Sequence, residues 1–260
     1  AAKVGLIKAI KDYDLKRVIS FHNRVDNAKY FSESLSDILS IIIKDQKPNG
    51  KIWTDHVSGK MSAGDRKIKI NQLRELEAVD RGILTNARCL SEGVDVRALD
   101  GITFIDPKSS KIDIIQAVGR AIRKSPDKSK GTIILPVFIE DGDNEIERIE
   151  KSQFRLVWDV LKAIRAHDDD LGDQIDNCRV QLAKNLNNFS GNFNDKIILD
   201  LPLNINPKFS ESLRTVLVEQ TSDNWLFWFA LLEEYSREKQ DCLVPKLYKT
   251  NEGYKLGSWV

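Results

Sequence analysis

Three polar side chains recur at helical intervals near the middle of the chain. The segment DIIQAVGRAIRKSP covers residues 113–126, and Gln116, Arg120 and Arg123 lie at i, i+4 and i+7 within it. On a helix of about 3.6 residues per turn this spacing groups the three side chains opposite an apolar stripe. Two guanidinium groups on one face are suited to neutralising phosphate oxygens. A solvated amphipathic helix has the same spacing, so the neighbouring segments must decide between the two interpretations.

Two further groups of polar residues directly follow apolar segments. His22 and Asn23 come after RVISF, and RCLSEGVDV, with Gly93 and Asp95, comes after ILTNA. Glycine permits a close approach of the backbone to a ligand, and a carboxylate can accept hydrogen bonds from ribose hydroxyls. Simpler interpretations remain open, because Asn23 is also a suitable helix cap and GxD also occurs in ordinary turns.

The elements that would position these residues alternate between strand and helix through residue 140. The apolar and β-branched segments predict strands at 17–21, 51–57, 81–87, 101–106 and 131–139. The helical periodicity predicts helices at about 24–43, 64–78 and 111–124. This order predicts an α/β fold with a mostly parallel sheet flanked by helices, which gathers its ligands at the carboxyl ends of the strands. Because all three polar groups fall at such ends, the residues point to nucleotide-phosphate binding.

The composition limits the class of protein and its surroundings. The chain has 260 residues, with 40 Lys and Arg against 39 Asp and Glu, so any surface for nucleic acid must be local. Its 3 cysteines are far apart and form no metal-ligand pattern, so we expect no metal site formed by cysteine and a cytoplasmic location. The longest apolar segments are too short to span a bilayer, so we expect no membrane partner.

The chain changes character after residue 142. Residues 143–214 show helical periodicity without strand signals, interrupted by the acidic segment HDDDLGDQ, and we interpret them as a helical connector. A third segment, 215–260, carries Trp225, Phe229 and Leu232 at helical spacing, which is more typical of a core face than of a base-stacking surface. The sequence therefore predicts a mainly α-helical C-terminal region.

The order of these segments resembles the second, C-terminal RecA-like lobe of a superfamily 2 helicase of the DEAD/DEAH-like kind from bacteria or phages. ILTNARCLSEGVD is similar to the fifth motif of that family, QAVGRAIR matches the QxxGRxxR pattern of the sixth, and VISFHNRV resembles the fourth. HVSGKMSAGDR resembles the strand and loop that follow the fourth motif. The resemblance covers residues 17–139 in the family's order.

The resemblance implies a role for each group of residues. It implies that Arg120 and Arg123 are arginine fingers on the β and γ phosphates of ATP, with Gln116 nearby. It further implies ATP and Mg²⁺ as cofactors, and nucleic acid, DNA rather than RNA, as partner. The residues that would line the nucleotide cleft are Gly93, Asp95 and Gly119. The residues that would approach nucleic-acid phosphates are His22, Asn23, Thr85, Asn86 and Arg88.

Residues 215–260 resemble the helicase-associated domain, a small helical module thought to bind DNA, and this module looks cut short at Val260. The GxxxxGK[ST] phosphate cradle and the DExx motif are missing from the sequence, and SGKMS fails the cradle pattern. We therefore expect that an N-terminal lobe of the same polypeptide completes the ATPase site, and that this fragment alone is inactive. The alternative is a non-catalytic RecA-like scaffold that binds nucleic acid or protein. A Rossmann-like enzyme is disfavoured because no GxGxxG follows the first strand.

Overall fold

The computed structural model describes residues 2–87, 99–106, 118–119, 131–183, 196–201, 205–251 and 253–260. The chain forms two compact units. The first comprises Ala1–Ile139 with Ser152–Ala163, and the second comprises Glu140–Lys151 with Ile164–Val260. The three sequence segments 1–142, 143–214 and 215–260 remain a prediction of domain boundaries.

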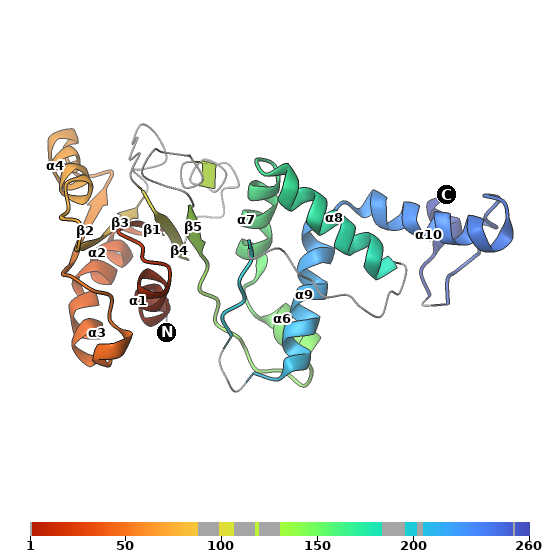
Figure 1. The fold of residues 1–260 in the computed structure, drawn as a ribbon, viewed down its shortest axis with the longest axis horizontal. Coiled ribbons are helices and arrows are strands. Elements are labelled where there is room, and N and C mark those ends of the chain that lie inside the picture. The colour runs from red at the N-terminus through yellow and green to blue at the C-terminus, as the bar shows by residue number, and fades with distance from the viewer. Residues whose placement is uncertain are drawn as a thin grey trace. The chain divides into compact units, whose positions relative to one another are not determined.

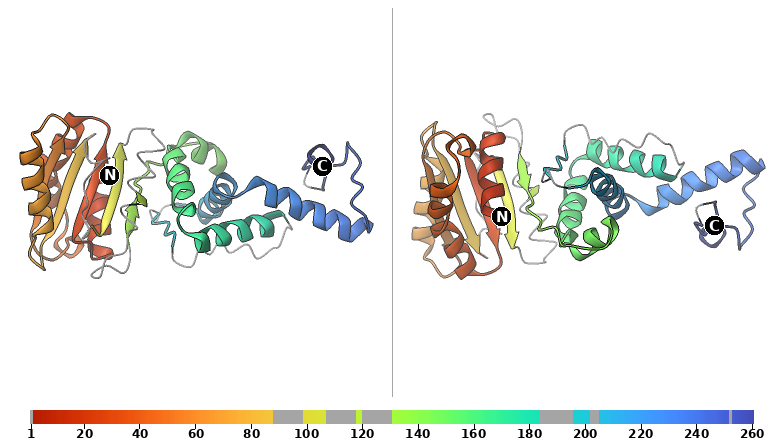
Figure 2. Two further views of the ribbon diagram at one scale, coloured as in Figure 1. Left: turned by 90° about the horizontal axis from the view of Figure 1, so that it is seen from above. Right: turned by 90° about the horizontal axis from the view of Figure 1, so that it is seen from below.

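A parallel five-stranded sheet forms the centre of the first unit, in the order β2-β3-β1-β4-β5 (Figure 2). Its strands are β1 (Arg17–His22), β2 (Ile52–Ser58), β3 (Arg81–Ala87), β4 (Gly101–Asp106) and β5 (Thr132–Ile134). Every neighbouring pair runs parallel, which confirms the predicted RecA-like α/β sheet. The fifth strand ends earlier than the sequence predicts, at Ile134, because Pro136 has no N–H group to continue the ladder.

Helices cover both faces of this sheet (Figure 1). They are α1 (Ala2–Asp12), α2 (Val25–Glu33), α3 (Leu35–Ile41) and α4 (Ala63–Arg74), with a short 3₁₀ turn, η1 (Lys44–Gln46). Helix α7 (Arg155–Arg165) follows later in the chain. The prediction of one continuous helix over 24–43 is wrong, because the helix breaks at Ser34. The backbone of Ser34 leaves the helical conformation, with φ −84° and ψ 2°, although its N–H still donates to the carbonyl of Tyr30 (3.0 Å).

The two faces of the sheet are distinguished by alternating residues of β3. Ile83 packs against Leu6 and Ile10 of α1 and Phe31 of α2 in one buried cluster. Gly82 faces α4, where an added Cβ would lie only 2.5 Å from a side-chain carbon of Leu73. The period of two therefore separates an α1–α2 face from an α4 face.

At the amino ends of the strands, carboxylates hold the backbone of neighbouring chain segments. Asp100 Oδ2 accepts hydrogen bonds from the N–H groups of Lys16 (3.0 Å) and Arg17 (2.9 Å). Asp80 Oδ1 accepts one from the N–H of Lys51 (2.9 Å). These bonds align the strand starts and therefore the register of the sheet.

The second unit is helical, as predicted for the C-terminal region. Its helices are α6 (Glu145–Lys151), α8 (Asp169–Ala183), α9 (Pro207–Thr221), α10 (Asn224–Lys239) and α11 (Leu256–Trp259). The acidic segment predicted to interrupt the helices begins α8, where Asp168 Oδ1 accepts a hydrogen bond from the N–H of Leu171 (3.0 Å). None of the described helices is long and apolar enough to cross a membrane.

The core of the second unit uses a different face of α10 than the sequence predicts. Phe227, Leu231 and Tyr235 are buried in a cluster that includes Leu256 of α11. The predicted core positions Trp225 and Phe229 are 54% and 38% exposed and stack on each other, with ring centroids 4.8 Å apart. The prediction is therefore wrong for Trp225 and Phe229, because helical spacing alone does not distinguish adjacent faces of a helix. Leu232, the third predicted core position, is partly buried and packs against the cluster.

Candidate nucleic-acid and nucleotide site

Four strands of the first unit end at the same edge of the sheet. In the parallel register His22 pairs with Ala87 on one side and with Asp106 on the other, and Ser58 pairs with Ala87. The edge therefore gathers residues that lie far apart in the sequence. Ligands bind at this edge in open parallel sheets.

His22 is a buried, neutral hydrogen-bonding group at the end of β1. Its Nε2 lies 2.8 Å from Ser20 Oγ, and its ring packs 4.9 Å from the ring of Phe31. Burial, which is the main cause, and the nearby charge of Lys3 lower the pKa of His22 from 6.5 to about 4, although Asp106 acts in the opposite direction. At neutral pH His22 therefore brings no positive charge to this edge.

Asn23 follows β1 and contacts the end of β4. Its Nδ2 lies 3.5 Å from Asp106 Oδ1, while Asn27 Nδ2 in the first turn of α2 donates to Asp106 Oδ2 at 2.9 Å. Asp106 and Asn27 are site residues that the sequence reasoning missed. Asp106 could have been found by the criterion that selected His22 and Asn23, because it is a polar residue at the end of an apolar strand.

Thr85 and Asn86, two predicted nucleic-acid contacts, are buried in β3. Thr85 Oγ1 lies 2.7 Å from the carbonyl oxygen of Ala28 in α2 and 3.3 Å from that of Asp55 in β2. In this structure Thr85 joins α2 to the sheet. Contact of Thr85 and Asn86 with nucleic acid remains a prediction.

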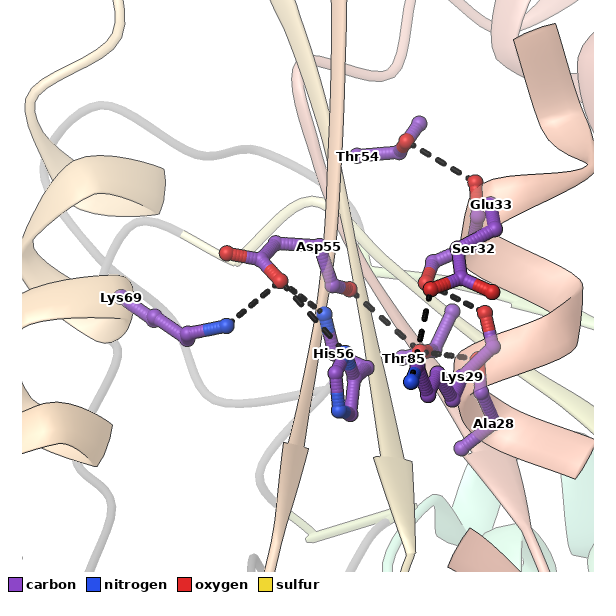
Figure 3. A network of polar contacts seen from close by, with 9 residues as sticks. All are labelled: Ala28, Lys29, Ser32, Glu33, Thr54, Asp55, His56, Lys69 and Thr85. Carbon is purple, nitrogen blue, oxygen red and sulfur yellow. Dashed lines mark hydrogen bonds and ion pairs between the residues drawn. The ribbon is translucent and has the colours of Figure 1, made fainter. Parts of the chain in front are cut away.

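Figure 3 shows how polar contacts hold helices on both sides of β2. Thr54 Oγ1 donates to the carbonyl of Ser32 in α2 (3.1 Å), and Lys69 of α4 forms an ion pair with Asp55 (2.6 Å) on the other side. Asp55 Oδ1 also accepts a hydrogen bond from the N–H of His56 (2.7 Å). Burial, followed by the charge of Lys69, lowers the pKa of His56. The Thr54 contact joins α2, the helix that carries Asn27, to β2, and the Lys69 contact joins α4 to the same strand.

Replacement of Thr85 by Val is expected to lower the free energy of unfolding of the first unit by about 1–2 kcal/mol. The substitution keeps the shape of the side chain but removes a buried donor from two carbonyl groups. Hydrogen exchange of the β3 amides measures the effect in this unit alone. The matched control is Thr54→Val, whose half-buried hydroxyl has one such bond. An equal or larger loss in the control would contradict the importance of the Thr85 contact.

Most of the predicted nucleotide residues lie outside the described residues. This holds for Gln116, Arg120, Arg123, Gly93 and Asp95, as well as for Arg88, a predicted nucleic-acid contact. Gly119 is described, and an added Cβ there would meet no atom of the described residues within 4 Å. Within the described ranges no group of three or more His, Cys, Asp or Glu side chains could hold a metal ion.

Comparison with known proteins finds two matches to protein families in this chain. Residues 3–125 match the helicase conserved C-terminal domain, and residues 222–260 match the helicase associated domain. The probable helicase A859L of African swine fever virus isolate Tick/South Africa/Pretoriuskop Pr4/1996 is 42% identical over 66 residues, or 25% of this chain and 8% of that protein. In isolate Pig/Kenya/KEN-50/1950 it is 42% identical over 55 residues, or 21% of this chain and 6% of that protein.

A solved structure shows the same fold. The ATP-dependent Type ISP restriction-modification enzyme LlaBIII bound to DNA aligns with a TM-score of 0.63 and 24% identity, over 91% of this chain and 16% of that chain. The matches thus span only a small part of the length of these relatives. Together with the parallel sheet they confirm the resemblance found in the sequence: residues 3–125 match the helicase conserved C-terminal domain, and residues 222–260 match the helicase associated domain.

Proposed function

We propose that this chain is the C-terminal part of an ATP-dependent DNA helicase or translocase and shares an ATPase site with a preceding RecA-like lobe. The observation that carries the proposal is the match of residues 3–125 to the helicase conserved C-terminal domain. The similarity to probable helicases of a virus supports it. In this proposal the preceding lobe supplies the phosphate cradle and the acidic residues for Mg²⁺.

Arg120 and Arg123 are proposed to act on the phosphates of ATP bound to that lobe, with Gln116 beside them. Phosphoryl transfer places developing negative charge on the β and γ phosphate oxygens, and two guanidinium groups stabilise that charge. Gly93, Asp95 and Gly119 are proposed to border the nucleotide.

The turn after β1 is proposed to contact the backbone of the nucleic acid. His22 is neutral and Asn23 is an amide, so they would contribute hydrogen bonds rather than charge, as is common for contacts to phosphates. DNA is proposed as the substrate because the restriction-modification enzyme that shares this fold was solved bound to DNA.

The test is ATP hydrolysis by the intact protein with double-stranded DNA, with single-stranded oligothymidylate, with RNA and with no nucleic acid. We expect DNA to raise the rate. If RNA raised the rate more than DNA does, RNA and not DNA would be the substrate. No hydrolysis under any condition would contradict the proposal of a motor and would favour the non-catalytic scaffold.

The isolated 260-residue chain is expected to show no turnover of Mg-ATP. Half of a shared ATPase site lacks the groups that hold the β and γ phosphates and the metal ion. Phosphate release by the purified chain, measured beside the intact protein at the same concentration, tests this expectation. If ATP hydrolysis by the isolated chain persisted after further purification, the ATPase site would not be shared as proposed.

A further inference from the structure

Asp106 lies at the junction between β4 and the turn that follows β1. The register between these strands shifts after Phe21, so that His22 pairs with Asp106, whereas Phe21 pairs with Phe104. The shift brings the last residue of β4 level with the last residue of β1. Asp106 is therefore adjacent to His22 and Asn23, the proposed contacts to nucleic acid.

One carboxylate here holds two side-chain amides. Asp106 Oδ2 accepts a hydrogen bond from Asn27 Nδ2 (2.9 Å), and Oδ1 lies 3.5 Å from Asn23 Nδ2. Asn23 precedes α2 and Asn27 lies in its first turn. The two contacts thus fix the start of α2 against the end of β4.

The carboxylates at the opposite edge have different partners. Asp100 and Asp80 accept hydrogen bonds from backbone N–H groups, which aligns strands. Asp106 instead holds the side chains of Asn23 and Asn27. Its contacts orient groups at the carboxyl edge, where the ligand is proposed to bind.

A negative charge at a phosphate-binding edge has an electrostatic cost, because phosphates are repelled by carboxylates. A carboxylate is explained at this position if its hydrogen bonds to Asn23 and Asn27 favour nucleic-acid binding by more than its charge opposes it. We propose that Asp106 is a positioning residue for nucleic acid, which holds Asn23 and the start of α2 in the arrangement that contacts the phosphate backbone. This inference rests on the proposed function of the turn after β1.

The proposal is tested by whether the affinity for nucleic acid falls or rises when Asp106 is replaced by a neutral residue. In the intact protein, Asp106→Asn removes one negative charge and weakens the hold on both amides. We expect its affinity for a fluorescein-labelled oligothymidylate to fall by about three- to tenfold, although the protein loses negative charge. The matched control is Asp26→Asn, which removes an exposed carboxylate from the first turn of α2 and should raise the affinity slightly.

A second variant separates positioning from folding and from charge. Asn27→Ala removes the 2.9 Å hydrogen bond and leaves every charge in place, so the affinity should also fall. If the two residues act together, the double variant should lose little more than either single variant. Asp100→Asn, at the other end of β4, should lower the stability of the sheet with less effect on oligonucleotide affinity. If Asp106→Asn does not fold, unchanged affinity in Asn27→Ala overturns the proposal.

ATPase measurements supply a readout that a purely structural role would not change. Asp106→Asn should raise the oligothymidylate concentration that gives half-maximal stimulation of ATP hydrolysis. It should lower the maximal rate of hydrolysis by a smaller factor. The inference is overturned if wild type is stimulated and Asp106→Asn binds as tightly as wild type or more tightly. If the wild type itself neither binds the oligonucleotide nor hydrolyses ATP, the proposed function fails, which is a different result.

Discussion

Replacing Arg123 by Ala in the intact protein is expected to lower DNA-stimulated ATP hydrolysis by about 10³-fold or more. Arg123 is the last arginine of the QxxGRxxR pattern, and we propose that it faces the γ phosphate of ATP on the preceding lobe. Its loss leaves the charge that develops in the transition state without its nearest cation. The rate is to be compared at matched nucleotide occupancy, so that weaker ATP binding is not mistaken for slower chemistry.

Two further variants define what Arg123 contributes. Arg123→Lys keeps the positive charge but loses the planar, two-pronged donor, so most of the rate should still be lost. Arg155→Ala removes an arginine whose side chain is 86% exposed and lies 4.0 Å from Asp159, and it should leave the rate near that of wild type. An unchanged rate in Arg123→Ala would place this arginine on a solvated helix face, the simpler interpretation of its spacing.

The sheet could be predicted from the sequence because strands and helices alternate with different hydrophobic periods. Strand β3 occupies the predicted residues, and β4 does as well. The break at Ser34 could not be predicted, because one residue that leaves the helical conformation, here with φ −84° and ψ 2°, does not remove the periodicity of the apolar residues around it.

The candidate site was predictable in its location but not in its contacts. Strand ends could be located, so His22 and Asn23 could be selected as polar groups at the expected edge. The sequence does not show that Thr85 Oγ1 faces the carbonyl of Ala28, or that a register shift after Phe21 brings Asp106 beside His22. Both depend on which residues of different strands and helices become neighbours, and this is decided by tertiary packing.

His22 is expected to make the stability of the first unit depend on pH below neutrality. Burial lowers its pKa from 6.5 to about 4, so between these values the unfolded chain binds a proton that the folded chain does not. The stabilisation is therefore complete above pH 6.5 and is lost as the pH falls toward 4. The shift corresponds to a loss of about 3 kcal/mol across this window, as an upper bound.

The free energy of opening of β1 and β3, measured by hydrogen exchange at about pH 7 and about pH 4.5, tests this expectation. His22→Gln should be less stable than wild type near neutral pH but should lose less stability on acidification, because Gln does not titrate. Some pH dependence should persist in this variant, since burial also lowers the pKa of His56. His167→Gln, at an exposed position in the second unit, should behave like wild type. If His22→Gln and wild type lose the same stability on acidification, His22 does not remain neutral in the folded protein, and its proposed contact to nucleic acid would then include a positive charge.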